Sequence, residues 1–130
     1  MKALSDSLID ADYISIHTPL TDETRGLIGA KEINLMKRSA FLINVARAQI
    51  VDREALFTSL VNKKIAGAAF DVFWEEPADP NDRLLKLDNF VSTPHLAGWT
   101  SESADTTTRI IASNINRVLH GKPTTLVNPN

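Results

Sequence analysis

Apolar and polar residues alternate along this chain in blocks of two kinds. Short runs rich in β-branched and aromatic residues are typical of strands, and longer runs with apolar residues three or four positions apart are typical of helices. Near-continuous apolar runs suit strands that are covered on both faces, as in a parallel sheet. The predicted strands cover Tyr13–His17, Ala40–Val45, Ile65–Phe73 and Asn89–Ser92.

Helices are predicted between and after these strands. Asp52 is a suitable N-cap for a helix over residues 53–64, because its carboxylate can accept from the free amides of the first turn. Thr100 is a suitable N-cap for the longest helix, which reaches about His120 before Gly121 ends it. Shorter helices are predicted over residues 4–10 and 30–36, and an irregular segment from Pro77 through Asp82.

The alternation of strands and helices indicates an α/β fold, in which right-handed crossovers join parallel strands. The sequence therefore predicts part of a doubly wound parallel sheet with flanking helices. A chain of 130 residues has room for one domain rather than two. We expect this domain to cover residues 1–121, with residues 122–130 as a linker or tail.

Composition excludes several classes of protein. Hydrophobic residues make up 43% and charged residues 23% of the chain, which is ordinary for a globular domain. The formal net charge is −2, so nucleic acid is not expected as a partner. The chain has no cysteine, which excludes disulfides and zinc–sulfur sites. Because no apolar run could span a bilayer and no secretion signal is visible, we expect a soluble, cytoplasmic protein without a membrane partner.

Chemically useful side chains follow the carboxyl ends of the predicted strands, where open parallel sheets bind ligands. They are His17, Arg47, Asp71 and His95, with Glu76 shortly after the third strand. Arginine matches a carboxylate with its planar fork, and histidine is the usual general acid or base, with a pKa that a nearby carboxylate raises. An arginine beside a His–Glu pair suits proton transfer at the oxygen of a 2-keto or 2-hydroxy acid.

Each of these residues also fits a structural role. Taken alone, His95 fits a loop cap and Arg47 a surface arginine at least as well as they fit an active site. Asp71 suits the capping of a turn as well as ligand binding, and Trp74 and Trp99 suit either a pocket wall or a domain contact. The sequence contains no H-E-x-x-H, calcium-loop or G-x-S-x-G motif, so neither a metal site nor acyl transfer is indicated.

Four blocks of residues resemble, in order and spacing, the motifs of the D-isomer-specific 2-hydroxyacid dehydrogenases, the family of D-3-phosphoglycerate, glyoxylate/hydroxypyruvate and D-lactate dehydrogenases. The blocks are H-T-P-L-T with a later threonine at 17–24, L-M-K through N-V-A-R and V-D at 35–52, G-A through D-V-F and E-P at 67–77, and T-P-H-L-A-G with a later threonine at 93–100. Together they cover nearly the whole chain. The resemblance implies an NAD-dependent oxidoreductase that transfers hydride between nicotinamide and a small D-2-hydroxy or 2-keto acid.

The resemblance also implies a role for each matching residue. Arg47 would bind the substrate carboxylate and carbonyl, His95 would donate or accept the proton, and Glu76 would be the carboxylate partner of His95. Asp71 would contact the nicotinamide carboxamide. The other implied cofactor contacts are Val45, Ala46, Arg47, His95, Ala97 and Gly98 on the nicotinamide side, and Thr18, Pro19 and Thr24 on the adenosine and phosphate side.

Two features depart from the family pattern. Ala48 stands where the family usually has glycine, and an alanine held at positive φ would cost about 1 kcal/mol. None of the five glycines forms the G-x-G-x-x-G turn that holds a pyrophosphate.

We therefore expect the C-terminal part of a Rossmann-type NAD-binding domain that lacks the first βαβ unit and has little activity by itself. The preference between NAD and NADP stays open, because the acidic residue that reads the ribose hydroxyl is missing as well. The unpaired sheet edge favours a homodimer. The alternative is a non-catalytic Rossmann-like binding or assembly module.

Overall fold

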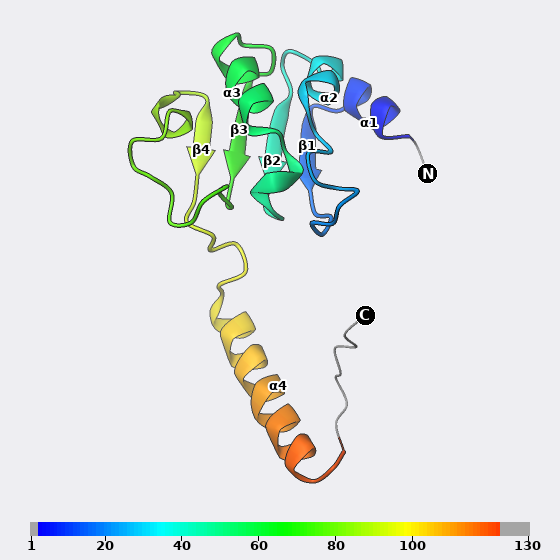
Figure 1. Ribbon diagram of the computed structural model, residues 1–130, viewed down its shortest axis with the longest axis vertical. Helices are drawn as coiled ribbons and strands as arrows, with labels where there is room; N and C mark the ends of the chain where they lie inside the picture. Colours follow the sequence, from blue (N-terminus) through cyan, green and yellow to red (C-terminus); the bar gives the residue numbers. More distant parts are fainter. Residues whose placement is uncertain (1–2, 123–130) are drawn as a thin grey trace. The chain divides into compact units, whose positions relative to one another are not determined.

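The structure is a computed structural model in which residues 3–122 are described. It divides into two units, Met1–Leu96 and Ala97–Asn130. The first unit contains α1 (Leu4–Asp10), β1 (Tyr13–Ile16), α2 (Ala30–Leu35), β2 (Phe41–Asn44), η1 (Ala48–Ile50), α3 (Arg53–Val61), β3 (Gly67–Phe70), η2 (Leu84–Lys86) and β4 (Phe90–Ser92), and the second contains α4 (Ser101–Leu119) (Figure 1). The strands pair in the order β1-β2-β3-β4, all parallel, so the predicted α/β class is confirmed.

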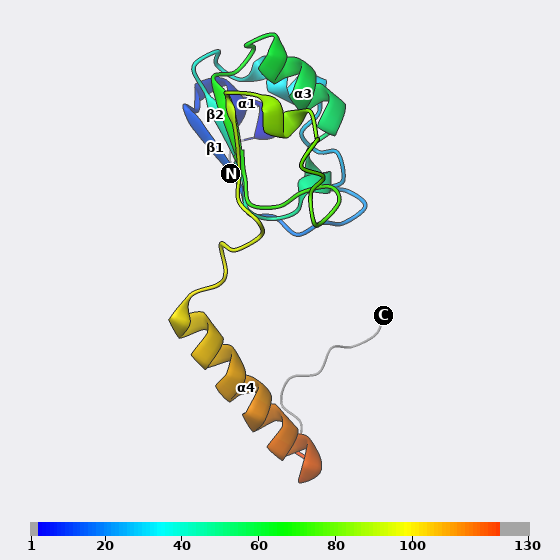
Figure 2. The same ribbon diagram turned by 90° about the vertical axis from the view of Figure 1, so that its left-hand side faces the viewer.

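Helices α1, α2 and α3 form one layer against the sheet, with α2 packed between the other two. Figure 2, turned by a quarter from Figure 1, shows α3 to one side of the strands. The sheet face toward this layer is the buried one, since alternate residues of a strand point to opposite faces. Its central row is Ile14, Leu42, Ala68 and Phe90, which pair in register across the four strands. The core therefore lies between the sheet and the three helices.

The opposite sheet face is not covered by the helices of the first unit. Tyr13 is 70% exposed, Val91 62% and Phe41 41%. The rings of Tyr13 and Phe41, which are neighbours across β1 and β2, stack with their centroids 5.7 Å apart. An apolar sheet face of this kind is unusual for parallel strands, which normally are buried on both faces.

The caps explain where the helices begin and end. Asp52 caps α3 as predicted, and its Oδ1 accepts from the Ala55 amide at 2.7 Å. The helix ends at Val61 rather than at residue 64, because Lys63 adopts a left-handed backbone (φ 50°) that is typical of the position after a helix. In the second unit Thr100 caps α4 as predicted and accepts from the Ser103 amide at 3.1 Å.

Strand β3 is shorter than predicted, because it ends at Phe70 and the chain leaves the ladder after the Asp71 amide, which still donates to the Asn44 carbonyl. The predicted strand continued to Phe73, but the Phe73 amide donates to Oε1 of Glu76 at 2.9 Å instead of to a neighbouring strand. The segment that follows is irregular up to η2, as Pro77 and Pro80 predicted. This early departure brings Glu76 back toward the end of the strand.

The second unit consists of α4 and its flanking residues. None of the residues in α4 is buried, and Ile111, Ile115, Val118 and Leu119 are all exposed. The predicted boundary at residue 121 stays a prediction, because the proposed tail lies outside the described residues except for Lys122. Across residues 3–122, no helix combines the length and the hydrophobicity that crossing a bilayer requires.

Candidate active site

The loop after β2 is shaped by a buried amide. The Asn44 side chain is fully buried, donates from Nδ2 to the Arg47 carbonyl at 2.9 Å, and accepts from the Ala46 amide at 3.0 Å. These two bonds fold the three residues after the strand into a tight turn, which leaves Arg47 exposed at the carboxyl edge of the sheet. The guanidinium Nη1 of Arg47 rests on the Ala46 carbonyl at 2.7 Å. Asn44 was not among the predicted site residues, although its place at a strand end was a usable signal.

Replacing Asn44 with alanine is expected to destabilise the chain by about 1–3 kcal/mol, because two backbone groups of the 45–47 turn lose their partners. Urea unfolding followed by circular dichroism measures this loss. Asn34→Ala is the matched control, because Asn34 is exposed on the surface of α2. Equal unfolding midpoints for the two variants would show that the Asn44 bonds contribute nothing.

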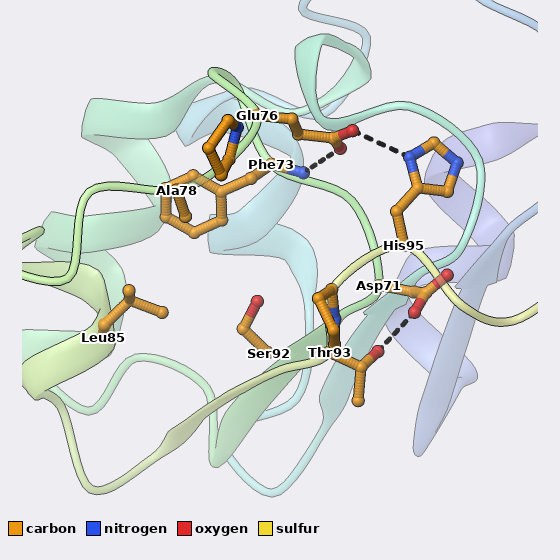
Figure 3. A pocket seen from close by; sticks show the side chains of 10 residues that line it. Asp71, Phe73, Glu76, Ala78, Leu85, Ser92, Thr93 and His95 are labelled. Atoms are coloured by element: carbon orange, nitrogen blue, oxygen red, sulfur yellow. Dashed lines mark hydrogen bonds and ion pairs between the residues drawn. The ribbon is translucent and has the colours of Figure 1, made fainter.

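Glu76 and His95 form a direct pair between the loop after β3 and the loop after β4. Nδ1 of His95 lies 2.9 Å from Oε2 of Glu76 (Figure 3). The other carboxylate oxygen, Oε1, accepts from the Phe73 amide at 2.9 Å. The bond with His95 holds the pKa of the Glu76 carboxyl below its ordinary value, and the Phe73 amide and the positive charges of His95 and Arg47 act in the same direction.

This lowered pKa predicts a pH dependence of stability. A carboxyl group that binds protons more weakly in the folded state stabilises the fold above its ordinary pKa of 4.5, and this contribution is lost as the pH falls through the folded pKa. Below about pH 4.5, the midpoint of urea unfolding should therefore fall more steeply for the wild type than for Glu76→Gln. The Glu76 side chain is 41% exposed, so solvent screening keeps the difference below about 1 kcal/mol.

The control for this titration is Glu75→Gln, which neutralises the adjacent exposed carboxylate and leaves the pair with His95 intact. It should follow the wild-type curve. Parallel curves for the wild type and Glu76→Gln across the acid range would contradict the prediction.

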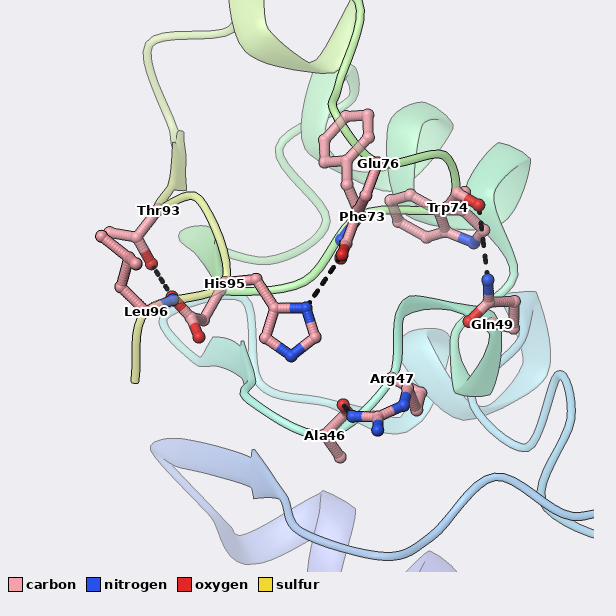
Figure 4. A network of polar contacts seen from close by, with 10 residues as sticks. Ala46, Arg47, Gln49, Phe73, Trp74, Glu76, Thr93, His95 and Leu96 are labelled. Carbon is pink, nitrogen blue, oxygen red and sulfur yellow. Dashed lines mark hydrogen bonds and ion pairs between the residues drawn. The ribbon is translucent and has the colours of Figure 1, made fainter. Parts of the chain in front are cut away.

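A cavity of about 280 Å³ brings the three predicted catalytic residues together. Arg47, Glu76 and His95 line it, along with Gln49, Phe73 and Trp74 (Figure 4). A second cavity, of about 380 Å³ and mostly apolar, is also lined by Glu76 and His95, with Phe73, Pro77 and Leu85 in its wall (Figure 3). The first cavity thus combines a cation, a carboxylate and an imidazole on loops that follow three different strands.

Trp74 and Gln49 connect the loops that carry Glu76 and Arg47. The Trp74 carbonyl accepts from Nε2 of Gln49 at 3.3 Å, and the indole Nε1 donates to the Val51 carbonyl at 3.2 Å. The Trp74 ring also stacks on Phe70 with centroids 5.5 Å apart. Trp74 is therefore a wall of the cavity, one of the two roles that its sequence position left open, whereas Gln49 was not predicted. Trp99 is 81% exposed and belongs to the second unit.

The remaining predicted residues lie in the segments that follow the four strands. In the loop after β1, Oγ1 of Thr24 donates to the Pro19 carbonyl at 2.7 Å, and Thr18 is half-buried. His17 pairs with Ser15 at 2.7 Å on the surface. Val45 is exposed after β2, and Ala97 and Gly98 belong to the second unit.

Asp71 is 6% exposed and accepts from the Leu96 amide at 2.9 Å and from the Thr93 hydroxyl, so it caps a turn.

The positive φ considered for Ala48 is not found. Ala48 opens η1, and the non-glycine residues with positive φ within residues 3–122 are Lys63 and His95. The replacement of glycine therefore carries no conformational cost here. Also within residues 3–122, no cluster of three or more histidine or carboxylate side chains is arranged to hold a metal ion.

Comparison with known proteins identifies relatives that are similar to this chain in sequence and in structure. The chain is 46% identical to a glyoxylate reductase from Aeropyrum pernix over 128 residues, which are 98% of this chain and 38% of that protein. A D-isomer specific 2-hydroxyacid dehydrogenase from Lactobacillus delbrueckii ssp. bulgaricus, solved in its NAD-complexed form, superposes with a TM-score of 0.87 at 34% identity, over 97% of this chain and 43% of that one. One from Xanthobacter autotrophicus Py2, solved with NADPH and MES, gives a TM-score of 0.79 at 38% identity, over 93% and 49% of the two chains.

The chain spans less than half the length of each of these proteins. Residues 1–97 match the family profile described as the NAD binding domain of D-isomer specific 2-hydroxyacid dehydrogenases. The matched segment contains all four strands and the cavity that joins Arg47, Glu76 and His95. On these grounds the chain belongs to the D-isomer specific 2-hydroxyacid dehydrogenase family, and to its NAD-binding domain.

Proposed function

We propose that this chain carries the catalytic side of a nicotinamide-dependent oxidoreductase that interconverts a small D-2-hydroxy acid and its 2-keto acid. The observation that carries the proposal is the pair between Nδ1 of His95 and Oε2 of Glu76, 2.9 Å apart, in the same cavity as the Arg47 guanidinium. Each partner has a chemical task in such a reaction, and the cavity of about 280 Å³ suits a small substrate.

Arg47 is the proposed substrate anchor. Its guanidinium is exposed and is held by a bond to the neighbouring Ala46 carbonyl, so it can turn to a carboxylate that arrives from solvent. Arginine binds a carboxylate with two parallel charge-assisted hydrogen bonds, which fixes the orientation of the acid as well as its position. The C2 oxygen of the substrate is then directed toward the imidazole.

His95 is the proposed proton carrier. Because Nδ1 faces Glu76, Nε2 is the nitrogen left to exchange a proton with the C2 oxygen. In the direction of reduction, C2 accepts a hydride, the carbonyl electron pair moves to oxygen, and that oxygen takes the proton from Nε2. Glu76 stabilises the imidazolium that donates it. A bound nicotinamide dinucleotide would supply or accept the hydride.

The residues present fit the nicotinamide end of such a cofactor. Val45 exposes an apolar side chain at the carboxyl edge of the sheet, next to the turn that the buried Asn44 amide fixes. An apolar surface beside polar groups is typical of cofactor sites. The 130 residues contain no G-x-G-x-x-G turn to hold the pyrophosphate.

A hybrid enzyme tests the proposal. In it, this chain replaces the matching segment of the Aeropyrum pernix glyoxylate reductase, to which it is 46% identical. The hybrid should reduce glyoxylate with NADH or NADPH, and a panel of larger 2-keto acids would define the substrate range. A hybrid that folds and binds NADH but reduces none of these acids would favour the non-catalytic module instead. The unmodified reductase is the control for assay and folding.

We further propose that the isolated chain forms a homodimer. Among the described residues, β1 is an edge strand with one side unpaired. The exposed rings of Tyr13 and Phe41 lie on the sheet face that the helices of the first unit do not cover. Exposed strand edges invite pairing with another chain. Light scattering at increasing concentration should give a mass of two chains, and Tyr13→Lys should shift the equilibrium toward the monomer. A monomeric mass at high concentration would refute this prediction.

A further inference from the structure

His95 has an unusual backbone conformation. Its φ is 57°, and among residues 3–122 the other non-glycine residue with positive φ is Lys63, at the end of α3, where this conformation is common. A residue with a Cβ atom is unfavourable in the left-handed region and persists there when its surroundings hold it. A constraint on the backbone of His95 therefore has to come from its neighbours.

The Asp71 carboxylate provides such a constraint. Its Oδ1 accepts from the Thr93 hydroxyl (Figure 3) and from the Leu96 amide, the latter at 2.9 Å, so it bonds to residues on both sides of His95. Between them, the His95 amide donates to the Thr93 carbonyl at 3.0 Å and closes the turn around Pro94. One buried oxygen thus ties together the two ends of the turn that presents the imidazole.

Asp71 is itself fixed to the sheet. Its amide donates to the Asn44 carbonyl at 3.0 Å, which continues the pairing of β2 with β3. The Thr93 amide donates to the Phe70 carbonyl at 3.0 Å, which continues the pairing of β3 with β4. These two ladder bonds fix the backbones of Asp71 and Thr93 to the sheet. The Asp71 carboxylate can therefore hold the turn from Thr93 to Leu96 in place.

We propose that Asp71, with the Thr93 hydroxyl, is a positioning residue that holds His95 in its left-handed conformation and so places the imidazole against Glu76. The proposal rests on the proposed function of His95. It assigns Asp71 a structural role other than the nicotinamide contact that the family resemblance implies. Without the Oδ1 acceptor, the Leu96 amide loses its partner, the backbone of His95 returns to negative φ, and Nδ1 moves away from Oε2 of Glu76.

The test uses the complete 130-residue chain labelled with nitrogen-15 and carbon-13, in three variants. Asp71→Ala removes the acceptor, Thr93→Val removes one hydroxyl at constant shape, and Thr93→Ser keeps that hydroxyl as the matched control. The coupling between the His95 amide and Hα protons, together with its Cβ shift, reports φ, and the imidazole nitrogen-15 shifts report the bond from Nδ1 to Glu76.

In Asp71→Ala, the positive-φ signature of His95 should be lost and the Nδ1 signal should shift to its position in Glu76→Gln. Thr93→Val should shift both signals part of the way, and Thr93→Ser should match the wild type. Unchanged amide signals of Leu42 and Leu56 would show that the core is intact. If Asp71→Ala does not fold, the comparison of Thr93→Val with Thr93→Ser tests the proposal. Wild-type His95 signals in folded Asp71→Ala or in Thr93→Val would overturn the proposal.

These spectra involve neither cofactor nor substrate, so they decide the positioning role even when the hybrid enzyme is inactive. In an active hybrid, Thr93→Val should lower kcat, on the order of 10- to 100-fold, with the KM for the keto acid and the affinity for NADH nearly unchanged. Thr93→Ser should restore kcat. A hybrid in which Thr93→Val weakens only NADH binding would overturn the positioning role and leave the proposed function standing.

Discussion

Replacing His95 with alanine in the hybrid enzyme is expected to lower kcat roughly 10²- to 10⁴-fold, the usual contribution of a positioned general acid or base. The reason is that Nε2 is the group placed to protonate the C2 oxygen, while Nδ1 is bound to Glu76. The affinity for NADH, measured by fluorescence titration, should change little, because removing the imidazole leaves the β2 turn and Val45 intact.

Two further variants sharpen this result. His120→Ala is the matched control, because His120 is an exposed histidine whose Nδ1 contacts the Asn116 carbonyl at the end of α4, and it should leave kcat at the hybrid's level. Glu76→Gln should lower kcat by less than His95→Ala does, since the amide still lies beside the imidazole but no longer stabilises its charged form. Normal turnover by His95→Ala would remove the basis of the proposed mechanism.

Replacing Arg47 with alanine should act mainly on substrate binding. The loss of charge-assisted hydrogen bonds to the substrate carboxylate corresponds to about 1.5–3 kcal/mol, or roughly a 10- to 150-fold loss in kcat/KM. Arg47→Lys should recover only part of this loss, because an ammonium group cannot form the two parallel bonds of the guanidinium. Initial rates at varied keto-acid concentration and saturating NADH measure both effects.

Arg38→Ala is the matched control for this series. Arg38 is exposed and precedes β2, whereas Arg47 follows it, so the two arginines lie at opposite ends of the same strand. The Arg38 variant should keep the KM of the hybrid. The substrate-anchor role would be wrong if Arg47→Ala and Arg38→Ala had the same kcat/KM.

Much of the fold was predictable because it depends on local signals. Asp52 and Thr100 cap their helices in the structure as their residue types predict, since the capping bonds reach only three residues along the chain. The strands were also located correctly, because apolar runs bounded by polar residues mark them. The ends of the strands were not predicted correctly. Strand β3, for example, ends at Phe70, and the Phe73 amide donates to the Glu76 carboxylate instead of to another strand.

The charged residues of the candidate site were predictable from the sequence, but the polar residues that hold their loops in place were not. Arg47, Glu76 and His95 could be selected because they follow strands that a parallel sheet aligns at one edge. Asn44, Gln49 and the Thr93 hydroxyl were missed, because a polar residue near a strand end has no sequence feature that reveals its partner. The bonds of Gln49 to Trp74 and of Thr93 to Asp71 join segments 25 and 22 residues apart, whereas those of Asn44 are local, two and three residues along the chain.

By itself, the sequence determined the alternation of strands and helices, the helix caps and the set of charged residues at the strand ends, because hydrophobic periodicity and capping are local properties. Only the tertiary structure decided that Arg47, Glu76 and His95 line one cavity, that Asp71 bonds to both sides of His95, and that His95 has a positive φ. The physical reason is that each of these features depends on the pairing of distant strands, which sets the distance between loops that the chain order keeps apart.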